Sequence, residues 1–216
     1  MNFPIFNAAN WPEIGIQVAI MLGFFLLIAF PVHEFFHAYA AYRLGDGTAK
    51  MFGKLTLNPI KHFHPVGGWM LVFSTVLFQL PFGFAATPVN PSNLRGRYAE
   101  AKVAAAGPLS NFLLAAIFAI PLRIVMETGI QFDYPIVYDI LRIIVYYDIL
   151  LGFFNLIPVS PLDGGTILLN FLPYRTAWQL RQLFSQFGIL ILVIIIFAGG
   201  RILIPLSDAV YRVLVG

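Results

Sequence analysis

The stretch "PVHEFFHAYAAYRLGD", residues 31–46, constrains this chain most, because it continues an apolar run yet carries three ionisable groups within five residues. His33 and His37 are four residues apart, so on an α-helix their side chains lie on one face, one turn apart. Glu34 directly follows the first histidine. Ionisable groups in a membrane segment are costly to bury and usually serve a function. A polar contact between two helices is the alternative, and the cost of burial argues against it.

The spacing of these residues is typical of a zinc-protease helix. Two histidines four residues apart can bind one metal ion, and the glutamate between them can reach a metal-bound water. Zinc lowers the pKa of its water to about 7. The sequence therefore predicts one catalytic Zn²⁺ bound by His33 and His37. Glu34 is predicted to act as the general base when the activated water attacks a peptide carbonyl.

The composition places the chain in a membrane. Hydrophobic residues make up 59% of the sequence and charged residues 11%, whereas soluble domains carry about 25% charged residues. The apolar excess is expected to face lipid. The chain has no cysteine, so protein ligands to a metal must come from His, Asp, Glu or backbone oxygen. No basic cluster alternates with aromatic residues, so no nucleic-acid partner is predicted.

Five apolar stretches are considered as membrane segments, each of which needs roughly 20 residues. They cover residues 14–44, 66–80, 103–126, 136–157 and 184–206, with a break expected at Gly199 and Gly200. The connections 43–65, 82–102 and 158–182 are basic, whereas 127–135 carries only acids. Basic loops favour the cytoplasm. We therefore predict an all-α, multi-pass membrane protein, a single metalloprotease domain over residues 1–216, with its site towards the cytoplasm.

The second stretch, 66–81, is predicted to be re-entrant. The basic loops before and after it share one side only if it dips into the membrane and returns. Irregular backbone at membrane depth is tolerated where protein or a water-filled cavity satisfies it. Residues 82–90, "FGFAATPVN", are rich in Gly and Pro and are interpreted as an extended return arm. A short true crossing is the alternative.

Asp163, within "NLIPVSPLDGG", is the candidate third ligand, since a catalytic zinc usually has three protein ligands. It follows the fourth stretch, and Gly164 and Gly165 allow close approach of the backbone. A turn or a helix cap is the alternative role. If 66–81 does not cross, His33 and Asp163 lie on the same side at similar depth. If it does cross, they lie on opposite faces and cannot share an ion.

These motifs, taken in order, resemble the site-2 protease family of intramembrane zinc metalloproteases. The resemblance rests on "HEFFH", "GPLSN" at 107–111 and "NLIPVSPLDGG" at 155–165, and it covers residues 14–170. "GDGTAKMFGKLTLNPIKHFHPVGG" and "ATPVNPSNL" are similar to a short bacterial subgroup without appended regulatory domains, which implies a bacterial inner membrane.

The resemblance implies a role for each matching residue. His33, His37 and Asp163 would bind zinc and Glu34 would be the base. Asn155 matches an asparagine thought to act near the substrate or the oxyanion, although a helix-end hydrogen bond is the alternative. Asn111 is expected to tie two helices together.

Two positions depart from the family pattern. Phe36 stands where many members carry glycine, and is expected to narrow or tilt that face of the helix. His64 stands where an acid is common. A second metal or a role in proton transfer is left open for His62 and His64.

The predicted function is hydrolysis of peptide bonds in or near transmembrane helices of other membrane proteins. Such a helix must first unwind, and an extended substrate could then add to an edge formed by residues 82–90. The partners are therefore membrane-protein substrates and the lipid bilayer, with homo-oligomerisation left open. The alternatives are a membrane zinc transporter or sensor, in which Glu34 has no role, and a noncatalytic scaffold.

Overall fold

In a computed structural model, which describes residues 11–63, 65–78 and 87–216, every regular element is helical. The longer helices are α1 (Trp11–Phe24), α2 (Phe30–Arg43), α5 (Pro65–Phe78), α6 (Ala99–Thr128), α8 (Pro135–Asn155), α9 (Asp163–Phe171) and α10 (Tyr174–Val215). The short elements are the π-helical η3 (Phe25–Ala29), α3 (Thr48–Met51), α4 (Pro59–His62), the 3₁₀ turn η4 (Pro91–Asn93) and α7 (Ile130–Asp133). The predicted all-α class is confirmed over this part of the chain, which contains no strand.

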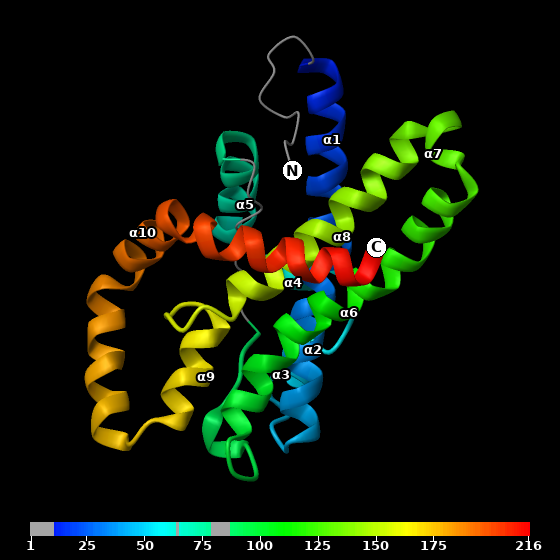
Figure 1. Cartoon of the computed structure of the whole chain (residues 1–216). Coiled ribbons are helices and arrows are strands. Elements are labelled where there is room, and N and C mark those ends of the chain that lie inside the picture. The colour runs from blue at the N-terminus through cyan, green and yellow to red at the C-terminus, as the bar shows by residue number, and fades with distance from the viewer. Residues whose placement is uncertain (1–10, 64, 79–86) are drawn as a thin grey trace.

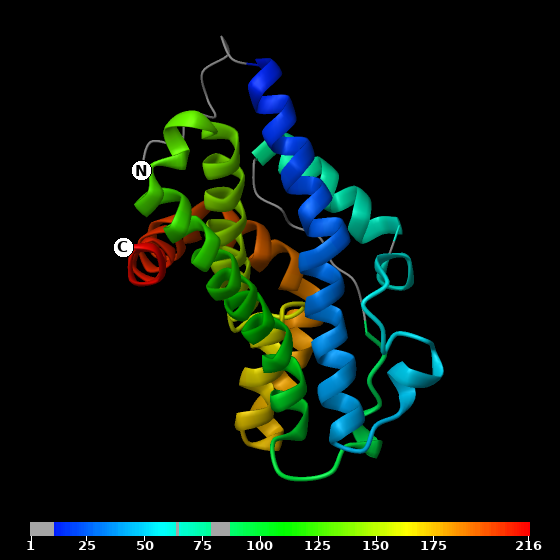
Figure 2. The same cartoon turned by 90° about the vertical axis from the view of Figure 1, so that its right-hand side faces the viewer.

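Helix α1, η3 and α2 form one long rod (Figure 2). Its π-helical turn lies just before Pro31, which is buried near the start of α2. Proline has no amide hydrogen, and its ring crowds the carbonyl four residues earlier. A widened turn relieves that crowding without ending the rod. The two histidines and Glu34 therefore lie on the helix that continues directly from the first apolar stretch.

Helices α6 and α8 form a hairpin through α7 and pack against each other and against the rod. Gly129, in the left-handed region at φ 77°, ends α6, and Pro135 starts α8 at a position where its missing amide costs nothing. The core between the rod, α6, α8 and α10 includes the fully buried Phe25, Leu122 and Ile149. This hairpin brings the "GPLSN" segment of α6 against α2.

Helix α9 returns beside α6, and α10 leads away before crossing α8 (Figure 1). The break predicted at Gly199 and Gly200 is wrong, because α10 is helical without interruption from Tyr174 to Val215. A glycine inside a helix costs only about 1 kcal/mol relative to alanine, which this long helix tolerates. Figure 1 shows that α10 changes direction along its course, and Pro205 lies within it.

By length and composition, two helical stretches of the described chain could cross a membrane, Val18–Arg43 and Ala99–Thr128. Three other predicted segments are helical, in α5, α8 and α10, so five membrane segments stay a prediction. Residues 79–86, which include most of the predicted return arm 82–90, lie outside the described residues. Residues 87–90 have no regular secondary structure.

The connections are distributed as their charges predict. The turn after α2, the loop before α6 and the junction of α9 with α10 lie at one end of the molecule, and α7 lies at the other (Figures 1 and 2). The first three belong to the basic connections and α7 belongs to the acidic one. The predicted separation of basic and acidic connections is therefore present in the fold.

Candidate metal centre

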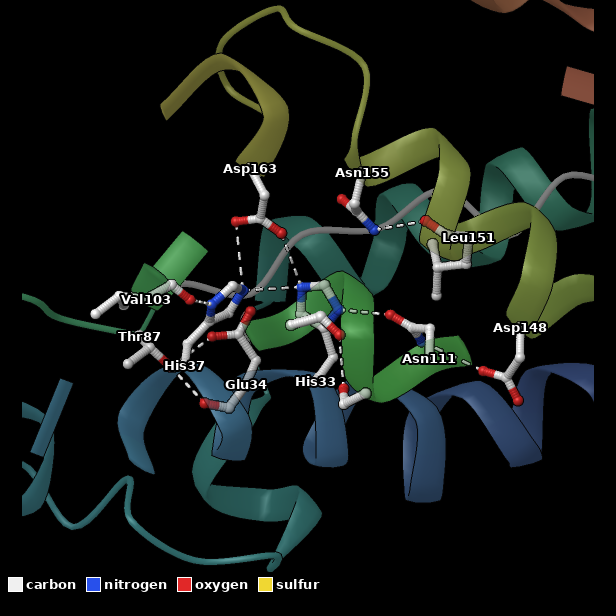
Figure 3. A network of polar contacts seen from close by, with 12 residues as sticks. His33, Glu34, His37, Thr87, Val103, Asn111, Asp148, Leu151, Asn155 and Asp163 are labelled. Carbon is white, nitrogen blue, oxygen red and sulfur yellow. Dashed lines mark hydrogen bonds and ion pairs between the residues drawn. The ribbon is translucent and has the colours of Figure 1, made fainter. Parts of the chain in front are cut away.

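The three predicted metal ligands, distant in sequence, converge at one point (Figure 3). Nε2 of His33 lies 3.2 Å from Oδ2 of Asp163, and Nε2 of His37 lies 3.3 Å from its Oδ1. The two Nε2 atoms are 3.0 Å apart. Helix α2 supplies both histidines, and the first residue of α9 supplies the carboxylate. This geometry is consistent with the predicted position of His33 and Asp163 on one side.

The hydrogen bonds of the two rings show why a cation suits this point. Nδ1 of His37 lies 2.8 Å from the backbone oxygen of Val103, and Nδ1 of His33 lies 2.7 Å from Oδ1 of Asn111. Both partners accept hydrogen bonds, so in each neutral ring Nδ1 carries the proton and Nε2 has a free lone pair. Two lone pairs and a carboxylate then face one another in a buried space. That arrangement is unfavourable unless a cation lies between them or one of the rings carries an additional proton.

The spacing of the three donor atoms fits zinc. Zinc binds imidazole nitrogen and carboxylate oxygen at about 2.0–2.2 Å in a tetrahedral arrangement. Two corners of such a tetrahedron are about 3.3 Å apart, and the observed separations are 3.0–3.3 Å. Catalytic zinc sites have three protein donors and a fourth coordination position for water or substrate, whereas structural sites have four protein donors. The three donors here match the catalytic type.

Gly107 of α6 leaves the space for these rings. A Cβ atom built there would lie within 2.6 Å of Nε2 of His33 and even closer to Nε2 of His37. Any side chain at this position would therefore displace the donor atoms. The "GPLSN" segment thus borders the site itself, in addition to packing two helices together.

Two further glycines place Asp163. Cβ atoms at Gly164 and Gly165 would overlap the backbone of residues 156–160, so the first turn of α9 packs directly on the loop that precedes it. This close packing positions Asp163 at the start of α9, where its side chain keeps 20% of its surface exposed. The close approach predicted for this glycine pair is confirmed.

Glu34 lies beside the histidines and is itself buried, with 5% of its surface exposed. The hydroxyl of Thr87 lies 2.5 Å from Oε2 of Glu34 and 3.1 Å from the Glu34 backbone oxygen. Thr87 therefore holds the carboxylate from a segment 53 residues away. Thr87 was not predicted from the sequence, because a single threonine in an irregular segment gives no signal.

Asn155, the last residue of α8, lies on the same side of the histidines as Asp163 (Figure 3). Its Nδ2 donates to the backbone oxygen of Leu151 at 3.0 Å. This is the helix-end hydrogen bond that the sequence left open as the alternative. The role near a substrate stays a prediction.

A second layer of polar residues supports His33. Asn111 of α6 accepts from His33 and donates through Nδ2 to Oδ1 of Asp148, 3.3 Å away on α8. Asn111 does tie helices together, as expected, and it also contacts a predicted ligand directly. Asp148 was not predicted from the sequence, although it is one of two acids, with Asp139, inside the apolar stretch 136–157, and an acid in such a segment usually serves a function.

The departure from the family pattern at Phe36 leaves the site intact. Phe36 is half-buried and its ring packs edge-on against Phe35, while α2 continues regularly to Arg43. His62 is buried and its Nε2 lies 2.6 Å from the backbone oxygen of Thr56. Within the described chain His62 does not join the group around Asp163, and His64 lies outside the described residues.

Comparison with known proteins points to zinc proteases. The model of Peptidase family M50 matches residues 121–199, a range that includes Asn155 and Asp163. A Bacillus subtilis (strain 168) protein named "Putative zinc metalloprotease YwhC" is 34% identical over 198 residues, which cover 85% of this chain and 84% of that protein.

More distant relatives carry a similar description. Proteins named "Putative zinc metalloprotease Rip2" are 28% identical over 194 residues in Mycolicibacterium smegmatis and 25% identical over 190 residues in Mycobacterium tuberculosis. Each match covers 85% of this chain and 68% of the relative. No solved structure is a significant match to the chain.

Proposed function

Because the chain belongs to peptidase family M50, the site-2 protease family, we propose that it is an intramembrane zinc metalloprotease. Its substrates would be transmembrane helices of other membrane proteins. The observation that carries this proposal is the convergence of Nε2 of His33, Nε2 of His37 and the Asp163 carboxylate beside a fourth ionisable group, Glu34. Metal binding alone accounts for the first three groups, and only hydrolysis accounts for the fourth.

In this proposal His33, His37 and Asp163 hold the metal and Glu34 moves the proton. Bound zinc supplies Lewis-acid chemistry, which lowers the pKa of a water molecule and polarises a carbonyl. Glu34 takes the proton of the attacking water on its carboxylate and delivers it to the nitrogen of the leaving amine. Thr87, 2.5 Å from Oε2, holds the carboxylate in one orientation. Asn155 is proposed to contact the substrate beside the carbonyl.

Several observations support a membrane location. The stretch Val18–Arg43 is one of the two apolar helices long enough to cross a bilayer, and it carries His33, Glu34 and His37. Ala99–Thr128, the other, carries Gly107 and Asn111. The basic connections gather at one end of the molecule, which favours a site open to the cytoplasm. A multi-pass protein of a bacterial inner membrane agrees with these features.

We propose that α5 enters the membrane and returns on the same side. Before α5, α4 packs against α2; after it, Thr87 bonds to Glu34 on α2. The segments before and after α5 therefore both contact α2. With 14 residues, α5 is about 21 Å long, shorter than the roughly 30 Å of a bilayer core.

The replacement Glu34→Gln tests this function against its alternatives. Purified protein in detergent would be assayed for bound zinc and for cleavage of a transmembrane peptide substrate. We expect Glu34→Gln to retain zinc and to reduce cleavage by at least about a thousandfold, because the base is lost while all metal ligands remain. His33→Ala should lose zinc and cleavage together.

The alternatives predict different results. A zinc transporter or sensor would keep its activity in the Glu34→Gln variant. A noncatalytic scaffold would tolerate both replacements. Full cleavage by Glu34→Gln would therefore contradict the proposed function.

A further inference from the structure

Asp148 is a buried acid for which the proposed mechanism has no use. It lies in the middle of α8, with none of its surface exposed, among buried apolar residues such as Val145 and Ile149. Oδ1 accepts one hydrogen bond, from Asn111, and Oδ2 has no hydrogen-bond partner within the described chain. A carboxyl group in such surroundings costs free energy, and an apolar side chain would join α6 and α8 at lower cost.

The partner of Asp148 leads directly to the metal centre. Asn111, also fully buried, lies between Asp148 and His33 (Figure 3). Its two amide atoms face different neighbours, with Nδ2 3.3 Å from Oδ1 of Asp148 and Oδ1 2.7 Å from Nδ1 of His33. The three side chains form one row of hydrogen bonds from α8 through α6 to α2.

The hydrogen bonds of this row have a defined order of donors and acceptors. The amide of Asn111 donates from its nitrogen and accepts at its oxygen. In the structure Nδ2 of Asn111 donates to Oδ1 of Asp148, so the amide oxygen faces His33. Nδ1 of His33 then carries the proton, and Nε2 keeps the lone pair that points at Asp163 and His37. A reversed amide would donate to Nδ1, move the ring proton to Nε2 and block the metal ligand.

His37 needs no second side chain to fix the position of its ring proton. Nδ1 of His37 lies 2.8 Å from the backbone oxygen of Val103. A backbone carbonyl can only accept and cannot reverse, so it fixes the ring of His37 by itself. The side chain of Asn111 could turn over, and among its hydrogen bonds within the described residues the one to Asp148 opposes this.

We infer that Asp148 is a positioning residue for the metal centre, which acts through Asn111 to select the tautomer of His33 that can bind zinc. This inference rests on the proposed function only in taking zinc as the ion. Outer groups that orient metal-binding histidines typically change metal affinity by about 10- to 100-fold when they are replaced. The same is expected of Asp148, although it reaches His33 only through Asn111 in the described structure.

The replacement Asp148→Leu tests this role by zinc affinity. Binding of Zn²⁺ to purified protein in detergent would be measured in competition with a chelator. We expect affinity to fall by about 10- to 100-fold, while the unfolding midpoint of the zinc-free protein stays the same or rises. Nitrogen-15 NMR of labelled histidine in the zinc-free protein should show a loss of the Nδ1–H form of one ring. Ser207→Ala is the matched control, because Ser207 is equally buried and its hydroxyl has no hydrogen-bond partner among the described residues.

A second pair of variants keeps the test decisive if Asp148→Leu folds poorly. With Asp148→Asn alone, two amides face each other and can pair in either direction, so zinc affinity should fall. The double exchange Asn111→Asp with Asp148→Asn places an accepting carboxylate against His33 and lets the new amide donate to it. This exchange should restore zinc affinity.

The outcomes separate this inference from the proposed function. Unchanged zinc affinity and an unchanged histidine tautomer in folded Asp148→Leu and Asp148→Asn protein would overturn the positioning role, while Glu34→Gln could still abolish cleavage. A loss of stability with no change in zinc affinity would reduce Asp148 to a structural contact and overturn the inference as well.

Discussion

Two aspartates join the second half of α2 to segments far along the chain, and their surroundings differ. Asp46, three residues after the end of α2, is fully buried and accepts four hydrogen bonds. The donors are the amide and hydroxyl of Thr48, the amide of Asn90 and the side chain of Asn93, at 2.5–3.1 Å. Asp163 instead faces two imidazole nitrogens that both point lone pairs towards it when neutral.

This difference separates a structural carboxylate from a ligand. Polar atoms of the chain itself use the bonding capacity of Asp46, so that residue fixes the loops beside the site and needs nothing more. The carboxylate of Asp163 has no N–H or O–H donor from a neutral group among these contacts, so its charge suits a cation. A carboxylate that faces acceptors is therefore better evidence for a metal site than a carboxylate that is merely buried.

Replacing Asp163 by Asn should have the largest effect. The variant loses the negative charge that faces both histidines. Zinc affinity should therefore fall by more than about a hundredfold, which exceeds the usual effect of losing a residue that only orients a ligand. Cleavage should fall together with zinc affinity. Chelator competition and peptide cleavage measure the two effects. The unfolding midpoint of the zinc-free protein should change little. Full zinc affinity in this variant would show that Asp163 is not a ligand.

The replacement Gly107→Ala should come next, because its methyl group would occupy the space of the two Nε2 atoms. We expect zinc affinity to fall by about a hundredfold, although alanine is ordinarily the better helix former by about 1 kcal/mol. Gly23→Ala is the control, since a Cβ atom there has no neighbour within 4 Å in the part of the chain that the structure describes. The control should bind zinc as the unmodified protein does. Equal affinity of both variants would mean that the site has more room than the geometry indicates.

The replacement Asp46→Asn should reverse the pattern of Asp163→Asn. Zinc affinity should be nearly unchanged, whereas the free energy of unfolding should fall by about 2 kcal/mol, since bonds to a charged acceptor are lost. Chemical unfolding at neutral pH measures this loss. A variant with full stability and weakened zinc binding would contradict the structural role.

Asp46 also predicts a pH dependence. Burial opposes its ionisation, but hydrogen bonds from Thr48, Asn90 and Asn93 outweigh burial and lower its pKa below the ordinary value of 3.8. A lowered pKa stabilises the folded state fully above the unfolded-state pKa, and this contribution is lost as pH falls through the folded pKa. The unmodified protein should therefore lose this stability below about pH 4. The Asp46→Asn variant should lose less over that range, and equal losses would reject the contribution of Asp46.

The smallest effect is expected from Thr87→Val, which keeps the shape and removes the hydroxyl that contacts Oε2 of Glu34. Cleavage should slow about tenfold, which corresponds to about 1.4 kcal/mol. Zinc affinity and the unfolding midpoint should stay the same, because none of the three proposed metal ligands is changed. Initial cleavage rates at saturating substrate measure this effect. A loss of zinc in this variant would place Thr87 among the groups that hold the metal.

The predictable parts of the site are those that depend on local spacing. His33, Glu34 and His37 could be placed on one helix because a helix repeats every 3.6 residues. Asp163 required a topological argument, and its convergence with the histidines agrees with that argument. The expected break at Gly199 and Gly200 failed, because two glycines weaken a long apolar helix without ending it.

By itself, the sequence determined the helical class, the apolar stretches, the zinc-type helix and the separation of basic from acidic connections, since these follow from periodicity, composition and local charge. Only the tertiary structure decided that Gly107 borders the histidines, that Thr87 holds Glu34 and that Asp148 reaches His33 through Asn111. These contacts join residues 37 to 78 positions apart. Such pairings are set by how helices pack in three dimensions, and no local rule of spacing encodes that packing.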